Sequence, residues 1–155
     1  MNEREMIYFE DSILYAIGKT ELYCRIKGAQ FFASNDFGVT LEQFCLLEIL
    51  SHSDATCQRD LSKRALKDRS NVSRILNILE EKGLVERQVD TKQKRLVKKV
   101  SITKKGRDLF EKIIPILRIR YSGHFEGITD EELITTKRTL EKLRINLSKD
   151  TAIQI

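Results

Sequence analysis

Residues 61–87 read LSKRALKDRSNVSRILNILEEKGLVER, and this stretch decides the fold. It contains the end of a short helix predicted over 57–66. Asp68 can then cap a second helix over 69–82. Apolar side chains recur along one side of that second helix and predict a buried stripe, formed by Val72, Ile75, Leu76 and Leu79. Gly83 stands where a glycine commonly follows a helix end, so the stretch predicts a helix, a turn and a second helix.

Two strand-like segments follow, over 84–89 and 96–102, and a polar, basic loop over 90–95 separates them. Thr103 can cap a further helix that runs to about 125, and Pro115 inside it predicts a kink. Two helices followed by two strands around a basic loop is the order of elements in a winged-helix DNA reader.

Positive charge is concentrated in the same part of the chain. Residues 56–107 hold 16 Lys and Arg against 6 Asp and Glu, a local net charge of +10. The remaining residues, with 12 basic and 17 acidic side chains, sum to −5. A polyanion is the expected partner of such a segment. The alternative is that these charges only form a solvated face. This interpretation is weaker here because the charges lie around turns and a strand pair and do not line one long helix.

Helices are also predicted on both sides of this segment. An apolar stripe predicts one over 6–33, and Thr40 with Gln43 forms a capping-box pattern for another that ends near 52. The buried side of that second helix is expected to include Leu41, Phe44, Cys45, Leu47 and Leu50. Thr129 can cap a last helix. Its leucines recur as in a short coiled coil: Leu133, Leu140, Leu143 and Leu147. The fold class is therefore mainly α with a small β-hairpin wing.

Composition favours a protein without catalytic machinery. The 155 residues fit a single domain, and one proline with seven glycines leaves little room for a many-turned β fold. The N-terminus lacks a signal-peptide pattern, and no apolar run approaches the roughly 18 residues of a membrane span, so a cytoplasmic location is expected. No nucleophile–base set or phosphate-cradling loop is recognisable, so neither enzyme activity nor a cofactor is expected. Glu48 and His52 alone are a weak indication of a metal.

The string over 61–87, the basic hairpin and the later VSITKKG over 100–106 resemble the multiple-antibiotic-resistance regulator (MarR) family of winged-helix transcription factors. The resemblance covers 40–107 by motif and nearly the whole chain by helix order. It implies one MarR-like domain over 1–155. In that domain 40–107 would form the DNA-binding lobe, and 1–36 with 108–150 the helical dimerisation lobe. It also implies a homodimer that binds double-stranded DNA at a palindromic operator, without a membrane partner.

Two departures from the family pattern affect the wing and the turn. The family's wing usually carries Asp-x-Arg-Arg, whereas this chain has Gln93, Lys94 and Arg95. The Asp–Arg pair of the hairpin is therefore absent or rebuilt through Asp90 and Arg95. The usual glycine between the two reading helices is also missing, with Leu66 standing about there.

The candidate DNA-binding side chains come from the recognition helix and the hairpin. The helix offers short polar groups and arginines suited to base edges and phosphates: Arg69, Ser70, Asn71, Ser73, Arg74 and Asn77. The hairpin offers Arg87, Lys92, Lys94 and Arg95, of which the last three are expected in a minor groove. Solvated faces are the alternative for both sets. Dimerisation is expected to use Ile7 and Leu14 together with the four leucines of the last helix.

The function expected is that of an effector-responsive, homodimeric repressor. A small molecule bound between the dimer helices and the DNA lobes would change the distance between the two recognition helices. Two alternatives stay open. One is a cysteine-based redox sensor, because some relatives sense peroxide through a first-helix cysteine. Cys24 lies in that helix beside Tyr23, although a packing role is expected for it. The other is a winged-helix module for protein contacts.

Overall fold

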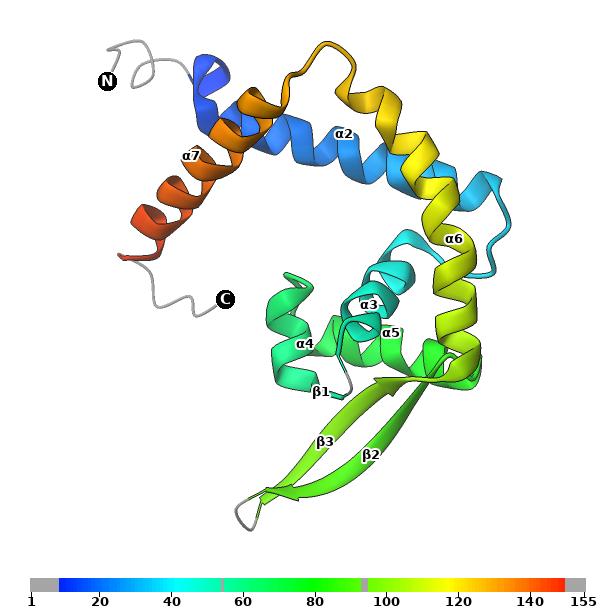
Figure 1. The fold of residues 1–155 in the computed structure, drawn as a ribbon. Helices are drawn as coiled ribbons and strands as arrows, with labels where there is room; N and C mark the ends of the chain where they lie inside the picture. The colour runs from blue at the N-terminus through cyan, green and yellow to red at the C-terminus, as the bar shows by residue number, and fades with distance from the viewer. Residues whose placement is uncertain (1–8, 54, 93–94, 150–155) are drawn as a thin grey trace. The chain divides into compact units, whose positions relative to one another are not determined.

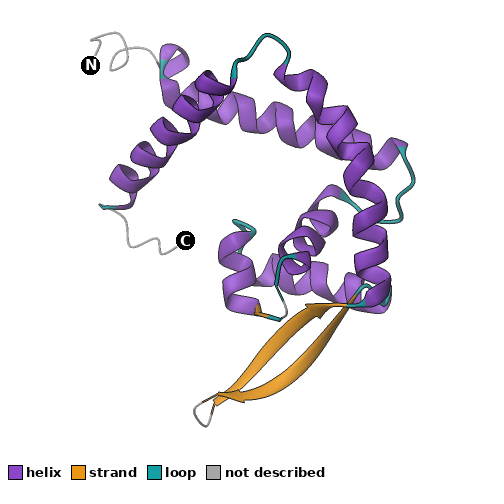
Figure 2. Ribbon diagram, viewed as in Figure 1, coloured by secondary structure: helices purple, strands orange, loops and turns teal. Residues whose placement is uncertain are grey.

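The computed structural model describes residues 9–53, 55–92 and 95–149, and it gives the backbone alone at 90–92 and 95–98. Helices dominate, and the strands form one three-stranded sheet (Figure 2). The chain divides into two compact units, 1–45 and 46–155, with the boundary inside helix α3 (Leu41–Ser51). The expected partition into a DNA-binding and a dimerisation lobe remains a prediction.

The first unit begins with the short 3-10 helix η1 (Phe9–Asp11) and the long helix α2 (Ile13–Ser34). The prediction that this helix starts at residue 6 is wrong for the part that is described. The reason is local, because Ser12 has extended backbone and its hydroxyl accepts the Tyr15 N–H at 3.1 Å, which starts the helix at Ile13. Residues 6–8 lie outside the described residues.

The predicted capping box at the start of α3 is confirmed, and a turn precedes it. Asp36 and Gly38 both have positive φ, which turns the chain back after α2. The Thr40 N–H donates to Gln43 Oε1 at 3.2 Å, and the Gln43 N–H donates to Thr40 Oγ1 at 3.3 Å. This reciprocal pair satisfies two N–H groups that the helix itself leaves unbonded.

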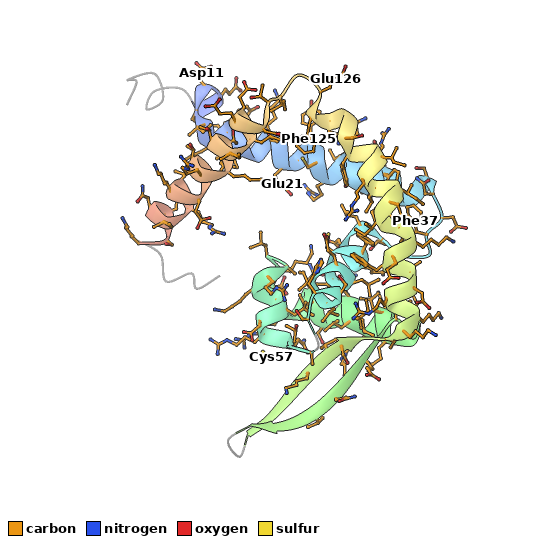
Figure 3. All side chains as sticks on the ribbon, in the orientation of Figure 1. Asp11, Glu21, Phe37, Cys57, Phe125 and Glu126 are labelled. Atoms are coloured by element: carbon orange, nitrogen blue, oxygen red, sulfur yellow. The ribbon has the colours of Figure 1, made fainter. Side chains whose placement is uncertain are left out.

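An aromatic cluster holds this turn in place. The buried Phe32 contacts the rings of Phe31, Phe37 and Phe44, with ring centroids 5.9, 5.4 and 5.2 Å away. Phe37 comes from the loop after α2 (Figure 3). Gly28 adds a close approach, since a Cβ there would lie 2.7 Å from the Leu41 side chain. The packing of the phenylalanine rings and the absence of a side chain at Gly28 thus fix where α3 begins.

The second unit contains the predicted helix pair and a sheet. Its first elements are β1 (Thr56–Cys57), α4 (Gln58–Arg64) and α5 (Arg69–Glu81), followed by β2 (Val85–Lys92) and β3 (Arg95–Ile102). The strands are antiparallel in the order β1-β3-β2. Two corrections to the sequence prediction follow. Strand β1 was not expected, and the hairpin strands are longer than expected, because Lys92 already pairs with Arg95. The tip, residues 93–94, lies outside the described residues.

The predicted stripe of α5 is confirmed as the core of this unit, since Val72, Ile75, Leu76 and Leu79 are all buried. Other elements contribute fully buried side chains to the same unit, including Leu47, Leu50, Leu61 and Val100. Of the side chains expected to be buried on α3, Phe44, Leu47 and Leu50 are buried, while Leu41 and Cys45 are only half-buried. Leu46 is fully buried although it was not predicted.

The chain ends with α6 (Lys104–Ser122), the 3-10 turn η2 (Gly123–Phe125) and α7 (Asp130–Ser148). Thr103 caps α6 as predicted, accepting the Gly106 N–H at 3.1 Å, and the helix continues through Pro115. Thr129 and Glu132 form a capping box on α7, and the Thr129 backbone N–H and hydroxyl hold the pKa of the Glu132 carboxyl below its usual value. Within the described residues, no helix has the length and apolar content needed to cross a membrane.

A tight joint connects α6 to the end of α5. Gly106 lies so close to the chain after α5 that a Cβ there would stand 2.1 Å from the Leu84 carbonyl oxygen. The Thr103 hydroxyl donates to the Gly83 carbonyl at 2.7 Å, and Lys105 Nζ donates to the Lys82 carbonyl at 2.7 Å. Thr103 and Lys105 of the TKKG segment therefore have a structural role, because their side chains bond backbone carbonyls at the end of α5.

Two helix ends in this unit close in the same way, but with different residues. After α5, Gly83 has φ +68, the Gly83 N–H bonds the Glu80 carbonyl, and the Leu84 N–H bonds the Leu79 carbonyl. After α4, Leu66 has φ +52 and makes the equivalent bond to Lys63. This closure requires left-handed backbone, which costs a leucine roughly 1–2 kcal/mol and a glycine far less. The turn after α4, where the family's usual glycine is replaced by Leu66, is therefore strained.

Substituting Gly106→Ala should lower the free energy of unfolding by about 2–3 kcal/mol, because backbone must move to admit the new methyl group. Thermal or urea unfolding measures this. The matched control is Gly123→Ala at the end of the same helix, where nothing lies within 4 Å of the new Cβ. That control should be neutral or stabilise by up to about 1 kcal/mol. Similar effects for the two variants would contradict the close approach.

Substituting Leu66→Gly should raise the free energy of unfolding by about 0.5–1 kcal/mol. The gain arises because relief of the left-handed strain exceeds the added entropy of the unfolded chain, and the Leu66 side chain is 74% exposed. Gly83→Ala is the opposite change at the equivalent position and should cost about 1 kcal/mol. Urea unfolding of both variants is the measurement, and a less stable Leu66→Gly protein would show that this side chain has a packing role.

Candidate nucleic-acid interface

Helix α5 separates its apolar and polar side chains onto two sides. Opposite the buried stripe stand the six residues predicted to bind DNA. Arg69, Ser70, Arg74 and Asn77 are exposed, and Asn71 and Ser73 are half-buried. Asp68 fixes the start of the helix, because its Oδ1 accepts the Asn71 N–H at 2.8 Å. The helix therefore presents hydroxyl, amide and guanidinium groups together to solvent.

One hydrogen bond joins two of these side chains. Arg74 Nη2 donates to Asn71 Oδ1 at 3.1 Å, one turn apart on the exposed surface. Arg74 is exposed and Asn71 is half-buried, so a polar group from solvent or a ligand can compete for this bond. The guanidinium of Arg74 retains further N–H donors beyond this bond.

Arg87 differs from the other predicted DNA contacts. Its side chain, which comes from β2, is only 19% exposed. The Arg87 Nε stands 3.4 Å from Glu80 Oε2, and Arg87 Nη2 donates to Asn77 Oδ1. The guanidinium is thus directed at α5, a geometry that the sequence did not predict. The sequence did not predict Glu80 as the partner of Arg87. The two residues are separated by the turn between α5 and β2, so helical spacing does not relate them.

The wing is described through its backbone. Strands β2 and β3 pair along their whole length and extend away from α4 and α5 as a two-stranded arm (Figure 1). Eight residues in a strand span about 26 Å, enough to reach beyond one groove of DNA. Lys92 and Arg95 face each other across the last described pair, and Lys94 lies outside the described residues. Asp90 pairs with Val97 and not with Arg95, so those two residues are not direct cross-strand partners.

Part of the positive charge serves the fold itself. Arg107 Nη1 donates to the Ser51 carbonyl at 3.1 Å, and Arg64 Nη1 donates to Ser53 Oγ at 3.0 Å. Lys105 bonds the Lys82 carbonyl as described above. These cations still contribute to the potential around the unit, but each has at least one donor engaged with a protein group. Part of the 16 Lys and Arg side chains of 56–107 is therefore held by the fold and not fully available to a ligand.

The residues predicted for dimerisation are incompletely covered within one chain. Leu14, Leu140 and Leu147 are exposed, and Leu133 and Leu143 are half-buried. Ile7 lies outside the described residues. Helix α7 has no buried residue at all, although apolar side chains recur along it.

None of the three cysteines occupies a fully buried position. Cys24 is exposed on α2, so the expectation that it packs as a small apolar group is wrong for the single chain. Cys45 and Cys57 are half-buried. Cys57 is the residue just before α4 (Figure 3), where its thiol donates to Asp60 Oδ2 at 2.9 Å.

The first unit contains a hollow of about 380 Å³ between the second half of α2 and the start of α3. Its lining is largely apolar, with Phe32, Val39 and Leu41, and it includes the charged Arg25 and Glu42. Arg25 also pairs with Glu21, with 3.3 Å between Nε and Oε1. Over the described ranges, no three His, Cys, Asp or Glu side chains gather as metal ligands would.

Comparison with known proteins gives consistent matches. Residues 37–96 match the sequence model of the MarR family. The chain is 30% identical over 99 residues to the uncharacterized HTH-type transcriptional regulator YkoM of Bacillus subtilis (strain 168), covering 64% of each protein. It therefore spans slightly less than two thirds of that relative.

Two crystal structures resemble the fold over almost its whole length. One is a MarR family transcriptional regulator from Silicibacter pomeroyi, with 25% identity, 97% of both chains covered and a TM-score of 0.76. The other is the MepR–DNA complex of S. aureus, with 26% identity, 90% of this chain and 99% of that chain covered, and a TM-score of 0.74.

Proposed function

We propose that this chain is a member of the MarR family and a sequence-specific DNA-binding regulator of transcription. The observation that carries the proposal is the two-sided helix α5, whose buried stripe anchors it while its polar side faces solvent. That helix lies in the segment with a net charge of +10. The similar MepR structure was solved bound to DNA, which supports the same class of partner here.

In this proposal α5 enters the major groove and the wing follows the adjacent minor groove. Short polar side chains and arginines can read base edges, while cations along the wing are attracted by the negative potential of a narrow minor groove. A winged-helix module for protein contacts is the alternative, and it gives no reason for the concentration of cations around α5 and the hairpin.

The active form in this proposal is a homodimer that acts as a repressor. The exposed leucines of α2 and α7 support self-association, because water would otherwise contact a large apolar surface. Two recognition helices related by a two-fold axis must stand about 34 Å apart to enter successive major grooves. An effector bound in the hollow beside Phe32 and Arg25 could alter that spacing and release the DNA.

Binding to DNA should weaken steeply with salt. If a dimer neutralises about 6–10 phosphates, its affinity should fall by roughly 10³–10⁵ between 50 and 200 mM salt, because released counterions drive the association. Fluorescence anisotropy with duplexes selected from genomic fragments measures this. A salt-independent affinity, or no DNA binding at all, would favour the protein-contact module.

Variants should separate base reading from phosphate contact. Arg74→Ala and Asn71→Ala should weaken binding to the selected operator by about 1–3 kcal/mol and affect random DNA less. Lys94→Ala and Arg95→Ala should weaken both and reduce the salt slope by about one. Lys112→Ala, which also removes an exposed cation but lies outside 56–107, serves as the control. Equal losses on both DNAs for all four variants would place the base-reading surface elsewhere.

The protein should be a dimer at micromolar concentration, with twice the chain mass of 18.0 kDa in light scattering. Leu140→Lys should shift the mass toward one chain, because a charge cannot be buried without a partner. Thr139→Lys places the same charge one residue earlier on α7 and should leave the dimer intact. A native mass of one chain at all concentrations would contradict the dimer.

A further inference from the structure

We propose that Arg87 determines which chemical groups Asn77 can present to DNA. Arg87 is then a positioning residue, and Asn77 is the residue that touches the base. The inference rests on the proposed function, because it concerns how α5 reads a sequence. Its starting point is that the predicted DNA contact at Arg87 is engaged with the recognition helix instead.

The guanidinium of Arg87 is held from two directions. Its Nη2 donates to Asn77 Oδ1, and its Nε stands 3.4 Å from Glu80 Oε2. The Nε atom is buried and makes no hydrogen bond among the described residues, so its approach to Glu80 is an ion pair only. The Arg87 side chain is mostly buried whereas Glu80 is exposed, so burial of the arginine is what limits its rotation away from α5. The bond to Asn77 should therefore persist when DNA approaches.

The chemistry of the two groups fixes the orientation of the amide. A guanidinium carries only donors, so it must meet the oxygen of the Asn77 amide and not its nitrogen. The amide nitrogen, with two N–H donors, is left for other partners. Asn77 is exposed and stands three residues after Arg74 and seven after Ser70, which places it on the same polar side of α5.

The remaining donors select the base. An asparagine normally reads adenine with both atoms of its amide, accepting from N6 and donating to N7. The amide oxygen keeps a second lone pair, but a further donor would have to approach it beside the positive guanidinium. Asn77 therefore presents mainly its N–H donors, which meet the amino group of adenine unfavourably. Guanine presents two acceptors there, O6 and N7. Asn77 should thus favour guanine over adenine at the base it faces.

The other amide on this helix lacks such a constraint. Asn71 also has its oxygen bonded to an arginine, but Arg74 is exposed and belongs to the same polar side. DNA can compete for both members of that pair. The preference for acceptors is therefore assigned to Asn77, whose partner is held by Glu80.

The test is site selection from random duplex DNA with the full-length protein and four variants. Native protein should select guanine at one position of each half-site, and Asn77→Ala should lose that preference. Arg87→Met frees the amide oxygen and should raise adenine there by about tenfold relative to native protein. Arg87→Lys retains a donor facing Asn77 and should keep the native preference. Asn77→Asp keeps the Arg87 partner but removes both N–H donors, so it should lose the guanine preference.

Several outcomes would overturn the inference. An Arg87→Met protein with weaker binding to every sequence and a salt slope shallower by about one would make Arg87 a phosphate contact. An unchanged base profile in Arg87→Met would show that Arg87 does not set the preference. If Arg87→Met fails to fold, the Asn77→Asp variant decides, and a retained guanine preference in it overturns the proposal. Native protein without any sequence preference would instead refute the proposed function, and this inference with it.

Discussion

The close approach of Gly106 to the Leu84 carbonyl is the constraint on which the arrangement of α5, the hairpin and α6 depends. It joins α6 to the chain that leaves α5, one residue before the hairpin begins. The hydroxyl of Thr103 and the ammonium of Lys105 bond the carbonyls of Gly83 and Lys82 beside it. Because all three contacts are made to backbone carbonyls, they hold the start of α6 against the end of α5 and the beginning of the hairpin.

The sequence predicted well those features that depend on near neighbours. The caps at Thr40, Asp68, Thr103 and Thr129 each bond a backbone N–H three residues away, and all four are found. Gly83 and the buried stripe of α5 follow equally from local pattern. The recognised family is also supported by the comparisons. These signals are short-range, so a single sequence contains them.

What the sequence could not predict depends on residues far apart along the chain. Strand β1 has only two residues and exists because Thr56 pairs with Val100, which no local pattern encodes. The partners of Arg87 were also not predicted, because Asn77 and Glu80 lie across a turn from it. In the sequence, Arg107 cannot be distinguished from the other 15 Lys and Arg residues of 56–107. In the structure, its guanidinium donates to the Ser51 carbonyl. Composition gives the total charge of a segment, whereas only the fold decides which cations remain available to a ligand.

The sheet order also constrains how the chain reaches its native state. Strand β3 lies between β1 and β2, and two of its residues, Lys99 and Val100, pair with partners on both sides. The β2–β3 pairing is a local hairpin, but β1 and β3 are joined by positions 56 and 100, and both helices of the reading pair lie in the loop between them. Closing a loop of that length is slow compared with forming a helix or a hairpin. We therefore expect α4 and α5 to reach their final positions only after the hairpin has formed. The hairpin would then provide the strand edge on which β1 pairs.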